Sequence, residues 1–597
     1  MLLHKRYTSL MQKKITIKTI FNLILDKKPA LIWGQVITLL AILVSVPIPL
    51  MLPVMVDEVL LGKPATFVNA INATFGKTDA FTYIAIVTLS VVFLRFIYYF
   101  LTVILTKIFT KISKYVTYTI RERLLEHLQV TAMNEYEVLG SGALTANLVT
   151  DVNTLDSFIM TSVSKFVSSI LTLVAIAFVM IAIDPILGIL ILVIQPVIML
   201  LSKKMSRIVG GLKKAENQAI SNFQEDVGET LELFGQIKAS NQEKFFFQRS
   251  KKYAKEIERT SNEYGYKNVA YERLSYTIFL VMFEVLRASG LLLVAYSDLS
   301  IGMMFAMFGY IWFIMTPVQD LLGLQYSYAS ATSALERINT ILALKTEKSG
   351  TKSIEEKELT IELKNMSFYY AGELILSDIS FKIDAGSKIA LIGASGSGKT
   401  TLAQVIAGFY EKDSGLLQYN SLNVEELDKH SLRDKIFLVL QMPILFNDTL
   451  RFNITMGDES ISDEAIYRAL HIAQMSELVE SMPQALESVV GHHGIRLSGG
   501  QRQRLSIARM IIADPSVVIF DESTSALDVH TEAKLQIALE KVLKDKTVIT
   551  IAHRLSTVKS ADIIYVLEEG KIVQSGSHET LEEEEGHYRE FIQEQLL

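Results

Sequence analysis

The sequence of 597 residues contains no cysteine, and only 20% of its residues are charged. The absence of cysteine excludes disulfide-bonded folds, cysteine nucleophiles and thiolate metal sites. Because 50% of the residues are hydrophobic, the composition also excludes a disordered chain. The 58 basic and 64 acidic side chains give a net charge of −6, which argues against a nucleic-acid-binding protein. The chain is therefore expected to bury large apolar surfaces in its core or to insert them into a membrane.

The hydrophobic residues are concentrated in blocks before about residue 325. A helix needs about 20 apolar residues to cross a bilayer with a hydrocarbon core of ~30 Å. Several runs with few charges meet this requirement, so we predict six membrane-spanning helices rather than buried helices of a large soluble protein. The predicted spans cover residues 31–55, 81–106, 158–183, 185–202, 275–296 and 300–323.

Basic residues predict how these spans are oriented. Lysines and arginines precede the first span and follow the second and fourth spans, whereas the short connections after the third and fifth spans have none. The positive-inside rule therefore places the N-terminus in the cytoplasm, and an even number of spans returns the second half there. The first span is too long for a cleaved signal peptide. The apolar residues of the two long basic connections keep a helical spacing. We therefore expect the membrane helices to extend into the cytoplasm and the chain to reverse direction near residues 136–142 and 239–245.

A phosphate-binding loop follows a short apolar strand in the second half. The strand at residues 388–392 leads into G-A-S-G-S-G-K-T-T, which fits G-x-x-x-x-G-K-[ST]. Glycines let backbone N–H groups surround phosphate oxygens at a helix N-terminus. We expect Lys399 to contact the β- and γ-phosphates and Thr400 to bind Mg²⁺. The predicted nucleotide-binding residues of this loop are Gly393, Ser395, Gly396, Ser397, Gly398, Lys399, Thr400 and Thr401.

Two further motifs accompany this loop. A second apolar strand at residues 517–520 ends in Asp521 and Glu522, and strand ends point toward the ligand crevice in open α/β sheets. We expect Asp521 to hold Mg²⁺ through its water shell, and Glu522 to orient and deprotonate the attacking water. The sequence L-S-G-G-Q at residues 497–501 begins a helix, where Ser498 and glycine amides form either a second anion site or an ordinary N-cap.

With these motifs the chain resembles, over nearly its full length, an ATP-binding cassette (ABC) transporter of the exporter fold. In this half-transporter the membrane domain and the nucleotide-binding domain are fused in one chain. The resemblance implies a multidomain chain, with an all-α six-helix transmembrane domain followed by an α/β P-loop ATPase domain. We place these domains at residues 1–340 and 359–597, joined by a polar linker at 341–358. The resemblance also implies a dimer in which the signature of one subunit completes the ATP site of the other. The signature residues are Ser498, Gly499, Gly500 and Gln501.

The resemblance assigns further roles. Tyr370 resembles the aromatic residue that stacks on adenine, with Tyr369 as the second choice and strand packing as the structural alternative. Gln441 resembles the glutamine that senses Mg²⁺ and faces the membrane domain. His553 resembles the histidine that contacts the γ-phosphate, and residues 525–528 resemble the loop that links the two sites. Residues 136–142 and 239–245 fall where the family has its coupling helices.

One stretch departs from the family pattern. The family commonly has T-E-V-G-E-R-G before the signature, whereas residues 488–494 are S-V-V-G-H-H-G, so both acidic positions are lost. This loss puts charge pairing with the coupling helices in doubt. His492 and His493 could make coupling sensitive to pH, and the simpler interpretation is a neutral surface change.

The predicted function is ATP-driven transport across the cell membrane by alternating access. The protein is expected to be a multi-pass homodimer in the lipid bilayer, with ATP and Mg²⁺ as cofactors and the nucleotide-binding domain in the cytoplasm. A heterodimer with a related half-transporter is the alternative. The expected substrate is a lipid, an amphipathic drug-like compound or a peptide. An importer of siderophore-like substrates and an ATP-gated channel or regulator are the other hypotheses, and the intact Glu522 and His553 count against the channel.

Three ionisable residues lie within the predicted spans. Glu284 and Arg287 are three positions apart in the fifth span, and Arg95 lies in the second. Ionisable groups at membrane depth usually face a cavity or pair with one another. These residues are therefore expected either to contact a polar substrate or to form structural ion pairs.

Overall fold

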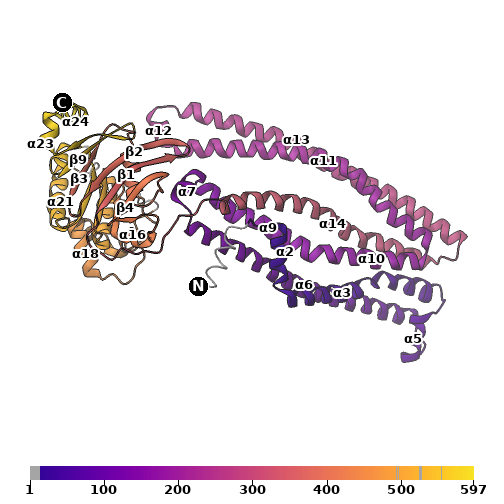
Figure 1. Cartoon of the computed structure of the whole chain (residues 1–597). Coiled ribbons are helices and arrows are strands. Elements are labelled where there is room, and N and C mark those ends of the chain that lie inside the picture. Colours follow the sequence, from indigo (N-terminus) through magenta and orange to yellow (C-terminus); the bar gives the residue numbers. More distant parts are fainter. Residues whose placement is uncertain (1–13, 492–493, 495, 523–527, 553, 597) are drawn as a thin grey trace. The chain divides into compact units, whose positions relative to one another are not determined.

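The computed structural model describes residues 14–491, 494, 496–522, 528–552 and 554–596 (Figure 1). The chain divides into two compact units. The helical unit comprises Lys13–Arg123 and Ala146–Asn339, and the sheet unit comprises Leu124–Thr145 and Thr340–Leu597. This order agrees with the predicted fold class, an all-α domain followed by an α/β domain. The exact boundaries at residues 340, 341–358 and 359 stay predictions.

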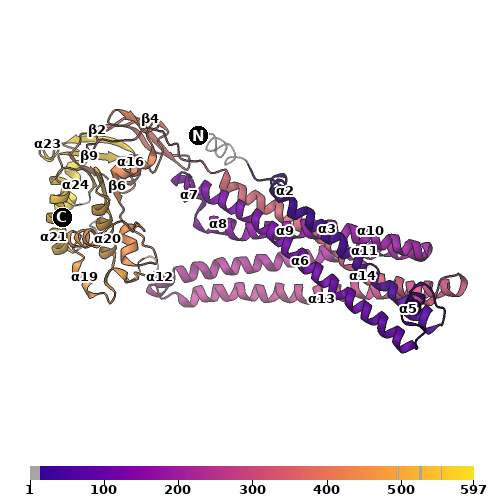
Figure 2. The ribbon, with the colours of Figure 1, turned by 90° about the horizontal axis from the view of Figure 1, so that it is seen from below.

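The first half of the chain is helical throughout its described residues, apart from short turns and connections. The long helices α11 and α13 run side by side (Figure 2). The elements are α2 (Ile17–Leu25), α3 (Lys28–Ser45), η1 (Ile48–Leu50), α4 (Met51–Pro53), η2 (Val54–Leu60), α5 (Thr66–Phe75), α6 (Ala80–Gln129), α7 (Met133–Leu139), α8 (Ser141–Ala146), η3 (Asn147–Asp151), α9 (Val152–Met160), η4 (Thr161–Lys165), α10 (Phe166–Ile183), α11 (Pro185–Glu232), α12 (Phe234–Ala239), α13 (Glu243–Tyr296) and α14 (Ile301–Leu342).

Among the described residues, five helical segments are long and apolar enough to cross a membrane. They contain four of the six predicted spans in full and all but the first residue of the sixth. The fourth predicted span lies at the start of α11, where a shorter apolar run, Pro185–Ile194, is described. The five segments are Lys28–Leu60, Ala80–Gln129, Ser141–Ile183, Glu243–Tyr296 and Ile301–Leu342.

Helices α6, α11 and α13 contain 50, 48 and 54 residues, far more than one membrane crossing requires. The chain reverses through α7 and α8 and again through α12, at or beside the two places expected from the sequence. A tight turn separates α10 from α11. There Asp184 caps α11 by accepting a hydrogen bond from the Leu187 backbone N–H at 2.8 Å, and Pro185 occupies the first helical position.

The first membrane segment is not a regular helix. Helix α3 ends at Ser45, and a 3₁₀ turn, one short α-turn and a π-helix follow in η1, α4 and η2. Pro47, Pro49 and Pro53 lack backbone N–H groups, so the normal helical hydrogen bonds cannot continue there. Leu50 N–H donates instead to the Pro47 carbonyl at 3.0 Å. This break lies inside the apolar run predicted as the first span.

The sheet unit contains two sheets. The first is antiparallel in the order β2-β1-β4-β5, and the second has the order β10-β9-β3-β8-β7-β6 with parallel pairing from β9 to β6. The strands are β1 (Ile361–Tyr370), β2 (Glu373–Ile383), β3 (Lys388–Ile392), β4 (Ser414–Tyr419), β5 (Leu422–Asn423), β6 (Ile436–Val439), β7 (Val517–Asp521), β8 (Thr547–Ile551), β9 (Ile563–Glu568) and β10 (Lys571–Gly576).

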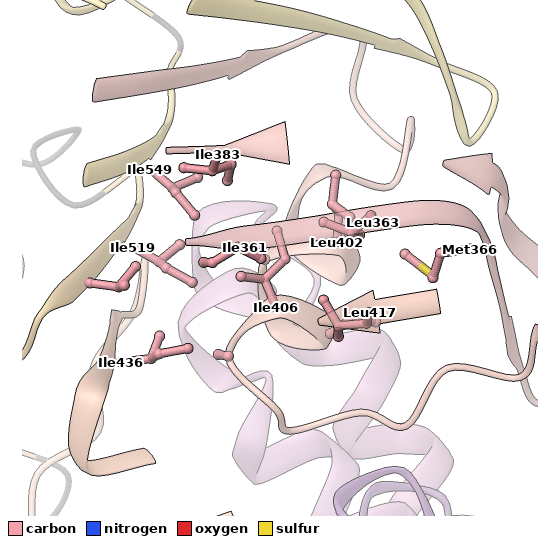
Figure 3. Packing of buried hydrophobic residues seen from close by; sticks show 14 of the residues in the cluster. Ile361, Leu363, Met366, Ile383, Leu402, Ile406, Leu417, Ile436, Ile519 and Ile549 are labelled. Atoms are coloured by element: carbon pink, nitrogen blue, oxygen red, sulfur yellow. The ribbon is translucent and has the colours of Figure 1, made fainter. Parts of the chain in front are cut away.

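Helices cover the parallel sheet, and an apolar core fills the space between the two sheets. Ile361 of β1, Leu402 of α15 and Ile519 of β7 are completely buried and point into this core (Figure 3). Strands buried on both faces need nearly continuous apolar sequences, as β3 and β7 have. The helices are α15 (Lys399–Ile406), α16 (Lys429–Lys435), α17 (Leu450–Thr455), α18 (Asp463–Ile472), α19 (Ser476–Ser481), η5 (Ala485–Glu487), α20 (Gly499–Ala513), α21 (Val529–Val542), α22 (Leu555–Lys559), α23 (His578–Glu583) and α24 (His587–Leu596).

Candidate nucleotide-binding site

The loop between β3 and α15 has the conformation that a phosphate-binding loop requires. Gly393, Gly396 and Gly398 have φ angles of 147°, 83° and 97°, which other residues rarely adopt. A Cβ atom on Gly393 would lie 2.0 Å from the Leu567 carbonyl oxygen of β9. Glycine is therefore required both for the turn and for its close approach to the sheet. Ser395, Ser397, Lys399, Thr400 and Thr401 complete the predicted set in this loop and in the first turn of α15.

Lys399 is folded beneath this loop. Its side chain is only 6% exposed, and its Nζ donates hydrogen bonds to the carbonyl oxygens of Gly393 at 2.9 Å and Ala394 at 2.8 Å. Burial lowers the pKa of Lys399, and the negative charges of Glu522 and Asp521 oppose that shift. Because the Lys399 ammonium group is already buried and held by neutral carbonyl oxygens, it does not have to be removed from bulk water when it binds a phosphate.

A hydroxyl and a carboxylate meet at the end of β7. Asp521 is the last residue of that strand and is 4% exposed. The Thr400 hydroxyl donates to Asp521 Oδ1 at 3.4 Å, because parallel strands β3 and β7 end at the same edge of the sheet. Oxygen ligands of this kind are those that Mg²⁺ prefers, so the residues present fit the predicted metal.

Glu522 and Gln441 are also brought together. Glu522 has a φ angle of 45°, in the left-handed region, directly after the buried strand. Gln441 follows β6, and its Nε2 donates to Glu522 Oε2 at 2.5 Å. The Gln441 carbonyl oxygen accepts a hydrogen bond from Gln503 of α20 at 3.0 Å. Helix α20 therefore helps to fix the glutamine that binds the proposed general base.

The signature residues begin α20. Ser498 is the N-cap, with Gln501 N–H donating to its hydroxyl at 3.2 Å and Ser498 N–H donating to Gln501 Oε1 at 2.8 Å. Gly499 and Gly500 form the first turn. Among the described residues, no hydrogen bond joins these four residues to the loop at 393–401 of the same chain. The structure therefore brings together Lys399, Thr400, Gln441, Asp521 and Glu522, and the described hydrogen bonds of this group do not include the signature.

Tyr370 has a partner that sequence reasoning missed. Its hydroxyl donates to Glu137 Oε2 at 3.0 Å, and the Tyr410 hydroxyl donates to the same oxygen at 2.7 Å. The Tyr370 and Tyr410 ring centroids are 5.9 Å apart. Burial, followed by the contact with Glu137, raises the pKa of both tyrosines. Tyr369, the second choice, is 47% exposed on the same strand.

The only sequence signal for Glu137 was its place in the reversal expected at residues 136–142. Nothing in the local pattern links it to aromatic residues more than 200 positions away.

Several predicted positions lie outside the described residues. These are His553, residues 525–527 of the linking loop, and His492 with His493. Asp528, the last residue of that loop, is described. It caps α21 by accepting a hydrogen bond from Thr531 N–H at 2.9 Å.

Comparison with known proteins gives matches to both halves of the chain. Residues 31–318 match the family model for the ABC transporter transmembrane region, and residues 376–525 match the model for ABC transporters. The chain is 30% identical over 494 residues to a putative multidrug export ATP-binding/permease protein, YgaD, of Bacillus subtilis, covering 81% of this chain and 84% of that protein.

One further relative matches half of the chain, and one solved structure matches the fold of nearly the whole chain. An ATP-dependent lipid A-core flippase of Haemophilus influenzae is 40% identical over 302 residues, which is 50% of this chain and 51% of that protein. The alignment thus spans about half the length of these flippases. The solved structure of a bacterial Atm1-family ABC exporter with ATP bound superimposes with a TM-score of 0.77 at 21% identity, covering 96% of this chain and 98% of that one.

Proposed function

This chain belongs to the ABC transporter family, and we propose that it is an ATP-driven exporter that works by alternating access. The observation that carries the proposal is that one chain combines the site around Lys399 and Glu522 with five helical segments able to cross a membrane. The matched relatives are named as a lipid flippase and a putative multidrug exporter. Those names support a lipid or a drug-like amphiphile as substrate and export as the direction.

The chemistry of the site is hydrolysis of the terminal phosphate of ATP. Backbone N–H groups of residues 393–398 and the Lys399 ammonium bind the phosphates. Thr400, Asp521 and Gln441 would hold Mg²⁺, which neutralises phosphate charge when it is bound. Glu522 orients a water molecule and accepts its proton as the water oxygen bonds to the γ-phosphorus and ADP leaves.

The remaining family roles are part of the same proposal. Tyr370 stacks on adenine, and His553 contacts the γ-phosphate. Ser498, Gly499, Gly500 and Gln501 complete the ATP site of a second subunit, and two identical chains would then form two complete sites. The N-terminus of α20 and its capping serine suit a phosphate from outside the chain, because the helix dipole favours negative charge there.

The proposed orientation places the N-terminus and the sheet unit in the cytoplasm of a multi-pass membrane protein. The lysines and arginines near the predicted spans support this orientation. ATP-bound dimerisation would bring two sheet units together, and the long helices would transmit that movement to the spans.

The proposal can be tested in inside-out membrane vesicles that contain the protein. We expect ATP-dependent accumulation of fluorescent lipids or amphipathic dyes in these vesicles, and no accumulation with Lys399→Ala, which removes the phosphate contact. Uptake equal to that of Lys399→Ala would contradict ATP-driven export. ATP-dependent movement only in right-side-out vesicles would instead establish import.

A further inference from the structure

The sheet unit buries a lysine that has no direct partner among the described residues. Lys429 is the first residue of α16 and is only 5% exposed. Its backbone N–H donates to the Ser349 hydroxyl at 3.1 Å, but no hydrogen bond or ion pair of the described residues involves its Nζ. Lysines are rarely this buried unless their charge is paired, because an ammonium group loses its hydration on burial. Lys429 has no role in the proposed ATP hydrolysis, so that reaction does not explain its burial.

Lys429 lines a small cavity of the sheet unit. The cavity has a volume of about 20 Å³, which is room for one occupant of about the size of a water molecule. The charged side chains of its wall are three lysines and two glutamates, and an aromatic and two aliphatic side chains form the rest. The wall consists of Lys348, Lys412, Lys429, Glu411, Glu425, Tyr410, Leu417 and Val424.

The charges around the cavity do not balance. Lys412 is paired with Glu425 at 2.8 Å, and its side chain is 8% exposed. Lys348 Nζ lies 3.8 Å from Glu411 Oε2, and Lys348 N–H donates to Glu411 Oε1 at 2.5 Å. Each glutamate of the wall thus already has a lysine partner. One positive charge, that of Lys429, is left over.

Two other charged groups that act on Lys429 do not supply the missing negative charge. Arg433 of α16 and Glu347 form an ion pair at 2.5 Å, so together they add no net charge. Burial lowers the pKa of Lys429, and the negative charge of Glu411 opposes that shift. Arg433 and Glu347 act on the same pKa in opposite directions. The cavity therefore keeps a positive charge at a cost in hydration, which an anion inside it would offset.

We propose that this cavity is a binding site for a small monovalent anion such as chloride. A single negative charge is enough to balance Lys429, whereas a dianion would leave an excess of negative charge beside Glu411 and Glu425. The volume also favours an ion close to the size of water over sulfate or phosphate. Lys348 forms the solvent side of the wall, because its side chain is 80% exposed. Binding at this site requires neither ATP nor transport, so it is separate from the proposed export function.

An anion in this cavity would join two segments of the sheet unit. Lys348 belongs to the segment between α14 and β1, and Lys429 begins α16. The two segments already run side by side, since Gly350 N–H donates to the Leu427 carbonyl at 2.8 Å. An anion in contact with both ammonium groups adds an ionic contact to this backbone pairing. Removal of the anion should therefore lower the stability of the sheet unit.

Chloride binding can be measured by the line width of the chloride NMR signal, because bound chloride relaxes faster than free chloride. The purified full-length protein in dodecyl maltoside would be titrated with sodium chloride in sodium gluconate, at constant ionic strength and without ATP. We expect a saturable excess line width, part of which Lys429→Met removes. This variant keeps the side-chain length without the charge, and the wall then has two lysines and two glutamates. Bromide should displace the part that depends on Lys429, and sulfate should not.

Two further variants complete the measurement. Lys357→Met is the matched control, because Lys357 is an exposed lysine of the same unit, and it should keep the full excess line width. Lys348→Met changes an exposed side chain and should fold normally, and we expect its chloride affinity to fall about 3–10-fold. Chloride in place of gluconate should also raise the thermal midpoint of the unmodified protein and of Lys357→Met, but not that of Lys429→Met.

An excess line width that is the same in Lys429→Met and in the unmodified protein would show that water, not an anion, accompanies Lys429, and would overturn the inference. Displacement by sulfate as effective as that by bromide would contradict a site for small monovalent anions. Because the titration contains no ATP, its failure would leave export itself intact, and a failure of vesicle uptake would leave the binding result intact.

Discussion

Glu522 is the residue on which the proposed hydrolysis depends most directly. Its carboxylate accepts a hydrogen bond from the Gln441 side chain, and the Gln503 side chain of α20 donates in turn to the Gln441 carbonyl oxygen. A general base typically contributes about 10²–10⁴-fold to a rate. We expect Glu522→Gln to lower ATPase turnover by that range while ATP still binds. Turnover and equilibrium ATP binding of the purified protein would be compared with those of Glu583→Gln, an exposed control. Near-normal turnover in Glu522→Gln would assign the base to another residue.

Glu137 provides a second prediction at the scale of single residues. If Tyr370 stacks on adenine, the hydrogen bond from its hydroxyl to Glu137 fixes the ring, and Tyr410 holds the same carboxylate. Glu137→Ala should therefore raise the KM for ATP about 3–10-fold with little change in kcat, the loss expected for one or two hydrogen bonds. Glu135→Ala is the matched control, because Glu135 faces Lys345 instead. An unchanged KM, or an equal rise in the control, would contradict this role.

The residues of the phosphate loop could be predicted because their spacing alone determines what they do. Gly393, Gly398 and Lys399 lie within seven positions, and local backbone geometry connects them. Glu137 could not be predicted in the same way, because its partners come from distant parts of the chain. The same limit applies to the ionisable residues of the spans. The sequence placed Arg95 and Arg287 in the membrane, but only the fold shows which one has a carboxylate beside it.

At the scale of elements, the broken first segment is the main feature that hydropathy did not reveal. An apolar run reports only that a segment can enter the bilayer, so residues 31–55 were predicted as one span. The prolines at 47, 49 and 53 mark where the helix changes, but the partner of the released Val46 carbonyl comes from α14. The long helical extensions were predictable, because their periodicity continues beyond the apolar runs.

Tyr310 tests how this break is stabilised. Its hydroxyl is the donor for the Val46 carbonyl, and its side chain is completely buried. Tyr310→Phe would leave that carbonyl unpaired, so we expect a loss of about 1–3 kcal/mol in stability and a lower thermal midpoint. The midpoint would be measured on purified protein in detergent. Tyr328→Phe is the control, since Tyr328 is 52% exposed and lies on the same helix. Equal midpoints for the two variants would show that the hydrogen bond contributes nothing.

At the scale of the whole molecule, the order of an apolar helical half and an α/β half was predictable from composition and from three motifs. The family matches over residues 31–318 and 376–525 agree with that order. Assembly could not be derived in the same way. Among the described residues, the signature around Ser498 has no hydrogen bond to the phosphate loop of its own chain, and its proposed partner belongs to a second chain.

The central claim is that each ATP site is built from two chains, and it predicts a specific complementation. A chain with Lys399→Ala and a chain with Ser498→Arg should each form an inactive homodimer. Co-purified through two different tags, the mixed dimer would retain one site with an intact phosphate loop from one chain and an intact signature from the other. Vanadate trapping of labelled nucleotide should therefore capture one nucleotide per mixed dimer and none in either homodimer. No trapping in the mixed dimer, with trapping by the unmodified protein intact, would contradict the account.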